Sequence, residues 1–298
     1  MKTGRNVGIG CYNAPECFVS NDQRSIYSPV AEAFQLAAVS NSRLCPTVVS
    51  SNHIFTLPEA CNCLAGLGEQ NMQIIRPRAI LGFGDSFMRR IMESWMTMIP
   101  QVNQYAKETR VPENVTIVEE APLLPCQDRS DGLQDITVIK LTAWLFRHLD
   151  SKIIPTLDGL HSRGVALDSL LVGFGIHNVF MPESEWPYWV NRTLSLIERH
   201  PSTQRARIFW MLPHWVAVTK FPYPKNETNA DNNVLIRQFN DLVIDTVARA
   251  QDKYPRWTVL DYYHLTEGRS EDSNDGVHFS SAVYRWKNQI LLNAMCPR

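Results

Sequence analysis

Ala79-Ile80-Leu81-Gly82-Phe83-Gly84-Asp85-Ser86 is the stretch of this chain that decides its predicted fold. Its first five residues are apolar or glycine, which is typical of a strand buried on both faces of a sheet. A glycine and two polar residues follow, and Phe87–Lys107 then favours a helix. A buried strand that turns directly into a helix is the opening of an α/β unit.

The same alternation continues to the C-terminus. Further strands are predicted at Val115–Glu119, Leu167–Gly173, Ala206–Leu212 and Trp257–Leu260. Further helices are predicted at Glu183–Arg199, Asn232–Ala250 and Ser281–Ala294, and the ambiguous stretch Thr137–Asp150 also favours a helix. This pattern predicts an α/β fold, a flavodoxin-like three-layer sandwich with a five-stranded parallel sheet. Active sites of such sheets lie at the carboxyl ends of the strands.

Length and patterning predict two parts in the chain of 298 residues. The α/β alternation places one catalytic domain at 76–298, a common size for a single domain of this class. The segment 1–75 has weak periodicity but holds five of the seven cysteines. It is therefore predicted to be an N-terminal extension held by disulfides rather than by a core.

Composition excludes several classes of partner. A net charge of −1 gives no electrostatic basis for binding nucleic acid. No apolar stretch reaches the length of about 18 residues that a membrane span needs. The cysteines lack paired zinc-ligand spacing, so neither a metal nor another cofactor is expected.

Cysteines and sequons predict the compartment. The chain has seven cysteines and three Asn-x-Thr sequons, at Asn114, Asn191 and Asn226. Both features favour the secretory pathway, lumenal or extracellular, where disulfides persist. Met1–Gly10 lacks the apolar core of a signal peptide, so this interpretation requires a truncated chain without its signal or anchor. The alternative is a reducing compartment with free thiols.

Three side chains from two distant motifs form a candidate catalytic triad. Ser86 follows the predicted first strand, while Asp275 and His278 follow the last one in Asp275-Gly276-Val277-His278. Both motifs should reach the same edge of the sheet. A serine hydroxyl, an imidazole and a carboxylate supply a nucleophile, its base and the orienting acid. The alternative is a purely structural role: a helix cap at Asp85-Ser86 and a surface turn at Asp275-Gly276.

These motifs resemble those of the SGNH (GDSL-type) esterase superfamily, in its PC-esterase-like branch. That branch includes the catalytic domain of sialate O-acetyltransferase and plant polysaccharide O-acetyltransferases. The resemblance covers about residues 78–296 and implies that Ser86 is the nucleophile, with Asp275 and His278 as its partners. It also implies an SGNH hydrolase fold and acyl transfer involving O-acetyl groups on carbohydrate.

The resemblance also implies an oxyanion hole. One donor is the backbone amide of Ser86, at the positive end of the following helix. The family's Gly-x-Asn block corresponds to Gly175-Ile176-His177-Asn178, where the asparagine comes one residue late. Asn178 is the predicted donor, with His177 as the alternative or as a substrate contact. Gly132 is the remaining candidate, for a backbone donor.

Four residues are candidates for substrate binding. Arg89, one helical turn after Ser86, has a place at which the branch commonly carries an arginine, and it could pair with a carboxylate. His177 follows the third predicted strand, and His214 and Trp215 follow the fourth, at the catalytic edge. Sugars stack on tryptophan rings, whereas the alternative for most of the tryptophans is core packing.

The function predicted from these features is serine-dependent acyl transfer, with hydrolysis of O-acetyl esters on carbohydrate as the first candidate. The substrate would be an O-acylated carbohydrate or another small ester. Transfer of the acetyl group to a glycan hydroxyl is an alternative, because both reactions share the acyl-serine intermediate. Two other classes stay open: an inactive glycan- or protein-binding module on the same fold, and a cytosolic lipid or thioester hydrolase.

Overall fold

The computed structural model describes residues 59, 78–98, 118–122, 136–217, 219–220 and 230–296 of the chain. The predicted extension, 1–75, lies almost entirely outside these residues, as does Gly132. The division into an extension and a catalytic domain therefore stays a prediction.

The described residues contain one six-stranded sheet in the order β2-β3-β1-β4-β5-β6. The strands are β1 Arg78–Gly84, β2 Val118–Pro122, β3 Ile136–Thr142, β4 Ala166–Gly173, β5 Arg207–Met211 and β6 Trp257–Leu260. All neighbouring pairs are parallel except β2 and β3, which are antiparallel. A sheet with five parallel strands is thus confirmed, but β2, which was predicted as one of the five, is antiparallel, and β3 is the parallel strand in its place.

One segment of the sheet was wrongly predicted to be a helix. The sequence analysis placed a helix at Thr137–Asp150, but Ile136–Thr142 forms the parallel strand β3. Its β-branched residues favour a pleated strand, and Val138, Ile139 and Leu141 are each 1% exposed. The strand predicted at Val115–Glu119 overlaps β2 only at Val118 and Glu119. β2 is antiparallel and lies on the edge of the sheet, where a terminal proline is tolerated.

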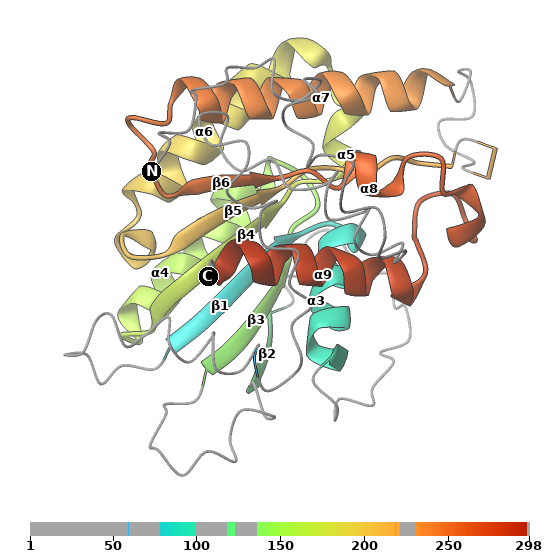
Figure 1. Cartoon of the computed structure of the whole chain (residues 1–298). Helices are drawn as coiled ribbons and strands as arrows, with labels where there is room; N and C mark the ends of the chain where they lie inside the picture. The colour runs from blue at the N-terminus through green and yellow to red at the C-terminus, as the bar shows by residue number, and fades with distance from the viewer. Residues whose placement is uncertain are drawn as a thin grey trace, which may run out of the picture.

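Helices cover both faces of the sheet (Figure 1). They are α3 Ser86–Met98, α4 Ile154–Ser162, α5 Ile176–Val179, α6 Trp186–Arg199, α7 Ala230–Arg249, α8 Tyr263–Thr266 and α9 Ser281–Met295. α3 and α9 pack side by side on one face, and α4, α6 and α7 cover the other. This is the predicted three-layer α/β sandwich.

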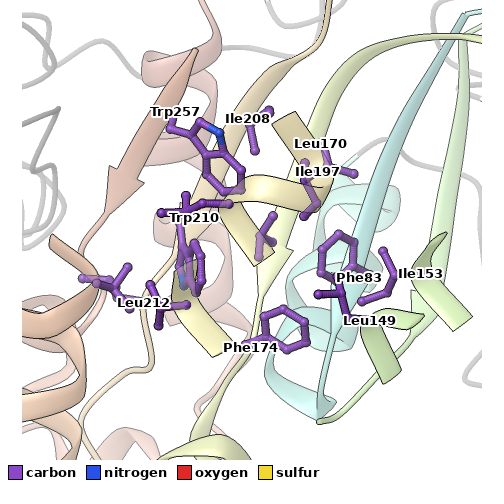
Figure 2. Packing of buried hydrophobic residues seen from close by; sticks show 14 of the residues in the cluster. Phe83, Leu149, Ile153, Leu170, Phe174, Ile197, Ile208, Trp210, Leu212 and Trp257 are labelled. Carbon is purple, nitrogen blue, oxygen red and sulfur yellow. The ribbon is translucent and has the colours of Figure 1, made fainter. Parts of the chain in front are cut away.

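Successive side chains of β1 point to opposite faces of the sheet and so contribute to both layers of the core. Leu81 and Phe83 face the α4/α6/α7 layer, whereas Ile80 faces α3 and α9. Figure 2 shows Phe83 and Phe174 in the larger layer, with ring centroids 5.4 Å apart in an edge-to-face arrangement. Full burial of each such side chain stabilises the fold by about 1.5–3 kcal/mol. The core therefore fixes the strand whose end carries Ser86.

Strand order fixes where a site can form. Numbered along the chain, the five parallel strands have the spatial order 2-1-3-4-5, which is the flavodoxin-like arrangement. Its connections reverse direction between β1 and β4, and ligands of such folds bind in the crevice at the carboxyl ends of these two strands. Ser86 follows β1, and the segment 174–178 follows β4. Within the residues described, the longest helices are too short or too polar to cross a membrane.

Candidate active site

A tight turn presents Ser86 at the carboxyl end of β1, as the first residue of α3. Gly84 is required there, because a Cβ atom at this position would collide with the Gly173 carbonyl and with the side chain of Met88. The Asp85 carboxylate accepts a 2.9 Å hydrogen bond from the Phe87 amide and thus caps the helix. Capping therefore falls to Asp85, and the half-buried Ser86 hydroxyl is left for another partner.

The structure joins the three predicted triad residues in one hydrogen-bonded chain. His278 Nε2 lies 2.8 Å from Ser86 Oγ, and His278 Nδ1 lies 2.6 Å from Asp275 Oδ2. Since a carboxylate can only accept, Nδ1 carries the proton and Nε2 accepts from the serine hydroxyl. The two motifs, 192 residues apart for Ser86 and His278, therefore meet with the geometry of a nucleophile, its base and an orienting acid.

Asp275 is held in its ionised form. Partial burial alone would raise its pKa, but hydrogen bonds from the His278 ring and from the backbone amides of His278 and Val277 outweigh that effect and lower it. The two amides donate to Asp275 Oδ1 at 2.7 and 2.9 Å. The carboxylate is thus charged at neutral pH and can stabilise an imidazolium at His278.

Backbone contacts anchor the loop that carries Asp275 and His278. Gly276, which has a φ of 84°, accepts a 2.8 Å hydrogen bond at its carbonyl from the Ala217 amide. The His278 carbonyl accepts one from Ser273 Oγ, also at 2.8 Å. Each carbonyl thus has a fixed donor, which holds the loop in one register against Ser86.

Asp85 adds a second, buried carboxyl group beside Ser86. Desolvation raises its pKa, against the charges of His177 and His278 and the Phe87 amide, which lower it. Its Oδ2 atom has no hydrogen-bond partner within the described residues. Gly175 makes room for this carboxyl group, since a Cβ there would overlap Oδ2. The Asp85 carboxyl group therefore packs closely against the segment after β4, and the Asp85 amide donates to the Gly173 carbonyl at the end of β4, at 3.4 Å.

The structure corrects the prediction for Asn178. Its side chain is fully buried, donates to the Trp144 carbonyl at 2.8 Å and accepts from the Phe146 amide at 2.8 Å. An amide enclosed in this way positions the segment after β3 and is not open to a substrate oxyanion. The Ser86 amide, by contrast, donates no hydrogen bond within the described part of the chain. It is the available donor at the N-terminus of α3, and Gly132 stays untested because it is not described.

Two of the predicted substrate contacts lie beside the turn that carries Ser86: the charge of His177 acts on Asp85, and Arg89 lies one helical turn after Ser86. His177 is exposed on α5 and stacks on half-buried Trp144, with ring centroids 6.0 Å apart and planes inclined by 23°. The sequence analysis did not single out Trp144. Arg89 is half-buried on the first turn of α3. Trp215 is half-buried and packs against both core layers. Substrate binding by these residues stays a prediction.

His214 does not have the predicted role. The ring is 5% exposed, and both of its nitrogens are engaged: Nε2 lies 2.6 Å from the Val277 carbonyl and Nδ1 lies 3.1 Å from Lys287 Nζ. The prediction that His214 contacts the substrate is therefore wrong, because the buried ring bonds the backbone of the catalytic loop, the segment 275–278 that carries Asp275 and His278. Lys287 was not identified from the sequence, where a lysine on a C-terminal helix is typical of a solvated face.

A second aspartate–histidine pair resembles the first. Asp261 and His264, just after β6, have the same spacing, and His264 Nδ1 lies 2.7 Å from Asp261 Oδ2. The other ring nitrogen, Nε2, lies 4.0 Å from Glu267 Oε2. An Asp-x-x-His spacing alone therefore does not define a catalytic base; the contact with Ser86 distinguishes His278.

Comparisons with known proteins leave the family open. No protein-family model matches the chain, and no curated protein matches it. One similar solved structure is "a putative platelet activating factor from Streptococcus pneumonia", with 15% identity, a TM-score of 0.44 and coverage of 80% of this chain and 92% of that one. Another is the N-terminal part of protein BF1531 from Bacteroides fragilis, containing a phosphatase domain complexed with Mg, with 9% identity, a TM-score of 0.39 and coverage of 80% and 55%. Similarities at this level carry no argument about function.

Proposed function

We propose that this protein is a serine-dependent ester hydrolase or acyltransferase. The observation that carries the proposal is the chain of hydrogen bonds from Ser86 through His278 to Asp275, at 2.8 and 2.6 Å. It lies at the carboxyl edge of a flavodoxin-like sheet, which is where such folds place their sites. A helix cap and a surface turn alone would not bring these three groups together.

The geometry suits attack on an ester carbonyl. Ser86 Oγ attacks the carbonyl carbon while His278 Nε2 takes the hydroxyl proton. The Asp275 carboxylate stabilises the imidazolium that forms, and the Ser86 amide donates to the developing oxyanion. The tetrahedral intermediate then collapses, His278 returns the proton to the leaving alcohol, and an acyl group remains on Ser86.

The second half of the reaction decides between the two activities. Attack by water on the acyl-serine gives a hydrolase, and attack by a sugar hydroxyl gives an acyltransferase. His278 would deprotonate either nucleophile in the same way. We propose hydrolysis as the main outcome, with transfer to a glycan hydroxyl as the alternative.

An O-acetylated carbohydrate is the proposed substrate. The support is the exposed His177 ring stacked on Trp144 near Asp85, together with the motif resemblance to carbohydrate O-acetyltransferases. Aromatic rings of this kind offer flat apolar surface to the C–H face of a sugar. No other partner is required by this chemistry.

Activity on acetyl esters is the test of this function. Purified protein should hydrolyse p-nitrophenyl acetate and release acetate from an O-acetylated oligosaccharide, as measured by product formation over time. When an unacetylated acceptor oligosaccharide is added, mass spectrometry of that sugar separates transfer from hydrolysis. Preferential turnover of a long-chain ester or an acyl thioester would contradict the carbohydrate assignment.

We also propose that the protein works in the secretory pathway, lumenal or extracellular. The support is the cysteine content and the disulfide bond of Cys296, the last residue described. The sequons give less support than expected. In the sequon at Asn191, the side chain donates to the Pro187 carbonyl at 2.7 Å, and Thr193 is fully buried.

Thiol titration tests this compartment. Titration of denatured, unreduced protein should detect one free thiol out of seven cysteines, or none if the odd cysteine joins two chains. The same protein after reduction is the control and should give all seven. Seven free thiols before reduction would place the protein in a reducing compartment.

A further inference from the structure

Lys287 is a fully buried lysine directly behind the candidate active site. It lies on α9, and its ammonium nitrogen lies over four aromatic rings: Phe87 at 4.4 Å, Tyr284 at 4.9 Å, and Tyr262 and Phe279 at 5.5 Å each. Burial of a lysine is costly and occurs where the amine has a specific task or partner. Its hydrogen-bond partner here is the ring of His214.

A directed chain of hydrogen bonds leads from Lys287 to the catalytic loop. Lys287 Nζ lies 3.1 Å from His214 Nδ1, and His214 Nε2 lies 2.6 Å from the Val277 carbonyl. A carbonyl can only accept, so Nε2 carries the proton of a neutral His214. Nδ1 must then accept, which requires a donor at the position that Lys287 occupies.

The tautomer of His214 therefore affects the position of the Val277 carbonyl, to which the ring donates. With the proton on Nδ1 instead, the Nε2 lone pair would face the lone pairs of the Val277 carbonyl, and the 2.6 Å contact would become repulsive. Val277 directly precedes His278, so a shift of its carbonyl moves the imidazole that contacts Ser86. The hydrogen bond from Lys287 favours the tautomer that avoids this shift.

We propose that Lys287 and His214 are positioning residues: Lys287 fixes the His214 tautomer that donates to the Val277 carbonyl, and this bond holds His278 in reach of Ser86. The expected effect on kcat rests on the proposed esterase function, whereas the hydrogen bonds from Lys287 through His214 to the Val277 carbonyl do not depend on it.

Burial gives the proposal a consequence for stability. Desolvation lowers the pKa of Lys287 well below its ordinary value, with the Asp85 charge acting in the opposite direction. The native state thus binds this proton less tightly than the unfolded chain, so keeping an amine here costs stability at neutral pH. Desolvation and the charge of Lys287 likewise lower the pKa of His214, which keeps this ring neutral. Removing the amine relieves this cost but leaves the buried His214 Nδ1 without its donor, so the two effects on stability oppose each other, whereas catalysis should be impaired.

A mutant cycle tests the relay on the full chain. Lys287→Met keeps an unbranched side chain that packs well against aromatic rings but removes the donor. It should lower kcat for p-nitrophenyl acetate by about 10- to 100-fold, since small misplacements in an active site cost up to about that much. KM should change little, and the melting temperature should stay close to that of wild type, because relief of the desolvation cost offsets the loss of the donor to His214 Nδ1.

His214→Gln is the second background in which Lys287→Met is tested. A glutamine amide can donate to the Val277 carbonyl and has no tautomers, so it needs no donor at position 287. The His214→Gln variant should retain kcat within about fivefold, and Lys287→Met added to it should have little further effect. An equal kcat loss in both backgrounds would overturn the proposal, because Lys287 would then act through packing. So would a kcat within twofold of wild type in Lys287→Met.

The tautomer itself can be read without any activity. Nitrogen-15 NMR of histidine-labelled wild-type protein should show His214 protonated at Nε2 and unprotonated at Nδ1. A proton at Nδ1 would overturn the proposal even if every variant failed to fold. Because this readout needs no substrate, it also distinguishes failure of the relay from failure of the proposed function.

Discussion

Ser86→Ala should lower kcat/KM for p-nitrophenyl acetate by at least about 10⁴-fold, since loss of a nucleophile leaves only binding and oxyanion stabilisation. The melting temperature should stay within about 1 °C of wild type, because the half-buried Ser86 side chain belongs to neither core layer and does not cap α3. Asp85, rather than Ser86, accepts the hydrogen bond from the Phe87 amide at the start of α3. Steady-state kinetics and thermal denaturation measure both quantities.

Ser280→Ala is the matched control for this change. Ser280 directly precedes α9, lies two residues after His278, and has a buried Oγ without a hydrogen-bond partner within the described residues. Its loss should leave kcat/KM within about threefold, as expected for a substitution outside the triad. A Ser86→Ala variant that keeps activity within tenfold of wild type would contradict Ser86 as the nucleophile.

His278→Gln should have the second large effect, a loss of at least about 10⁴-fold in kcat, since the base that activates Ser86 is removed. His264→Gln is its matched control. His264 has the same spacing to an aspartate and an equivalent Nδ1 contact, 2.7 Å in place of 2.6 Å. The control should stay within about threefold of wild-type kcat.

The triad should also behave as one unit. In the Ser86→Ala background, His278→Gln should cost little more, because residues that act together are strongly non-additive. Additive losses would mean that the two side chains act independently. Equal losses in His278→Gln and His264→Gln would argue that both act through stability, which thermal denaturation of the two variants checks.

The sequence predicted the triad because each of its members sits beside a strong local signal. Ser86 follows an unmistakable buried strand, and Asp275 and His278 follow the last strand. Parallel strands bring such positions to one edge, so the contact of Ser86 with His278 could be anticipated without distances. The spacing alone was less informative, as the second pair, Asp261 and His264, shows.

Strand β3 was missed because a short apolar run does not separate a strand from a buried helix by periodicity. The run Ile136–Thr142 contains β-branched residues that favour a strand, but the residues after it favour helix, and the two were merged into one element. The signal that could have separated them was the concentration of isoleucine, valine and threonine at its start.

The roles of Asn178 and His214 could not be predicted, because they depend on side-chain direction. Asn178 and His214 follow the carboxyl ends of β4 and β5, and residues at these positions are predicted from sequence to contact the substrate. In the folded chain both point inward, Asn178 onto the backbone of Trp144 and Phe146 and His214 onto Val277. Lys287 gave no sequence signal, because most of its partners are distant in sequence: Phe87 on α3, His214 after β5, and Tyr262 after β6.

Reaction with a fluorophosphonate probe, followed by mass spectrometry of the digested protein, tests the central claim most directly. The probe forms a covalent bond only with a serine whose hydroxyl is activated as a nucleophile. We expect one adduct, on Ser86, which disappears in Ser86→Ala and is strongly slowed in His278→Gln. No adduct on the folded wild-type protein, or an adduct on a different serine, would contradict the account and favour a binding module on this fold.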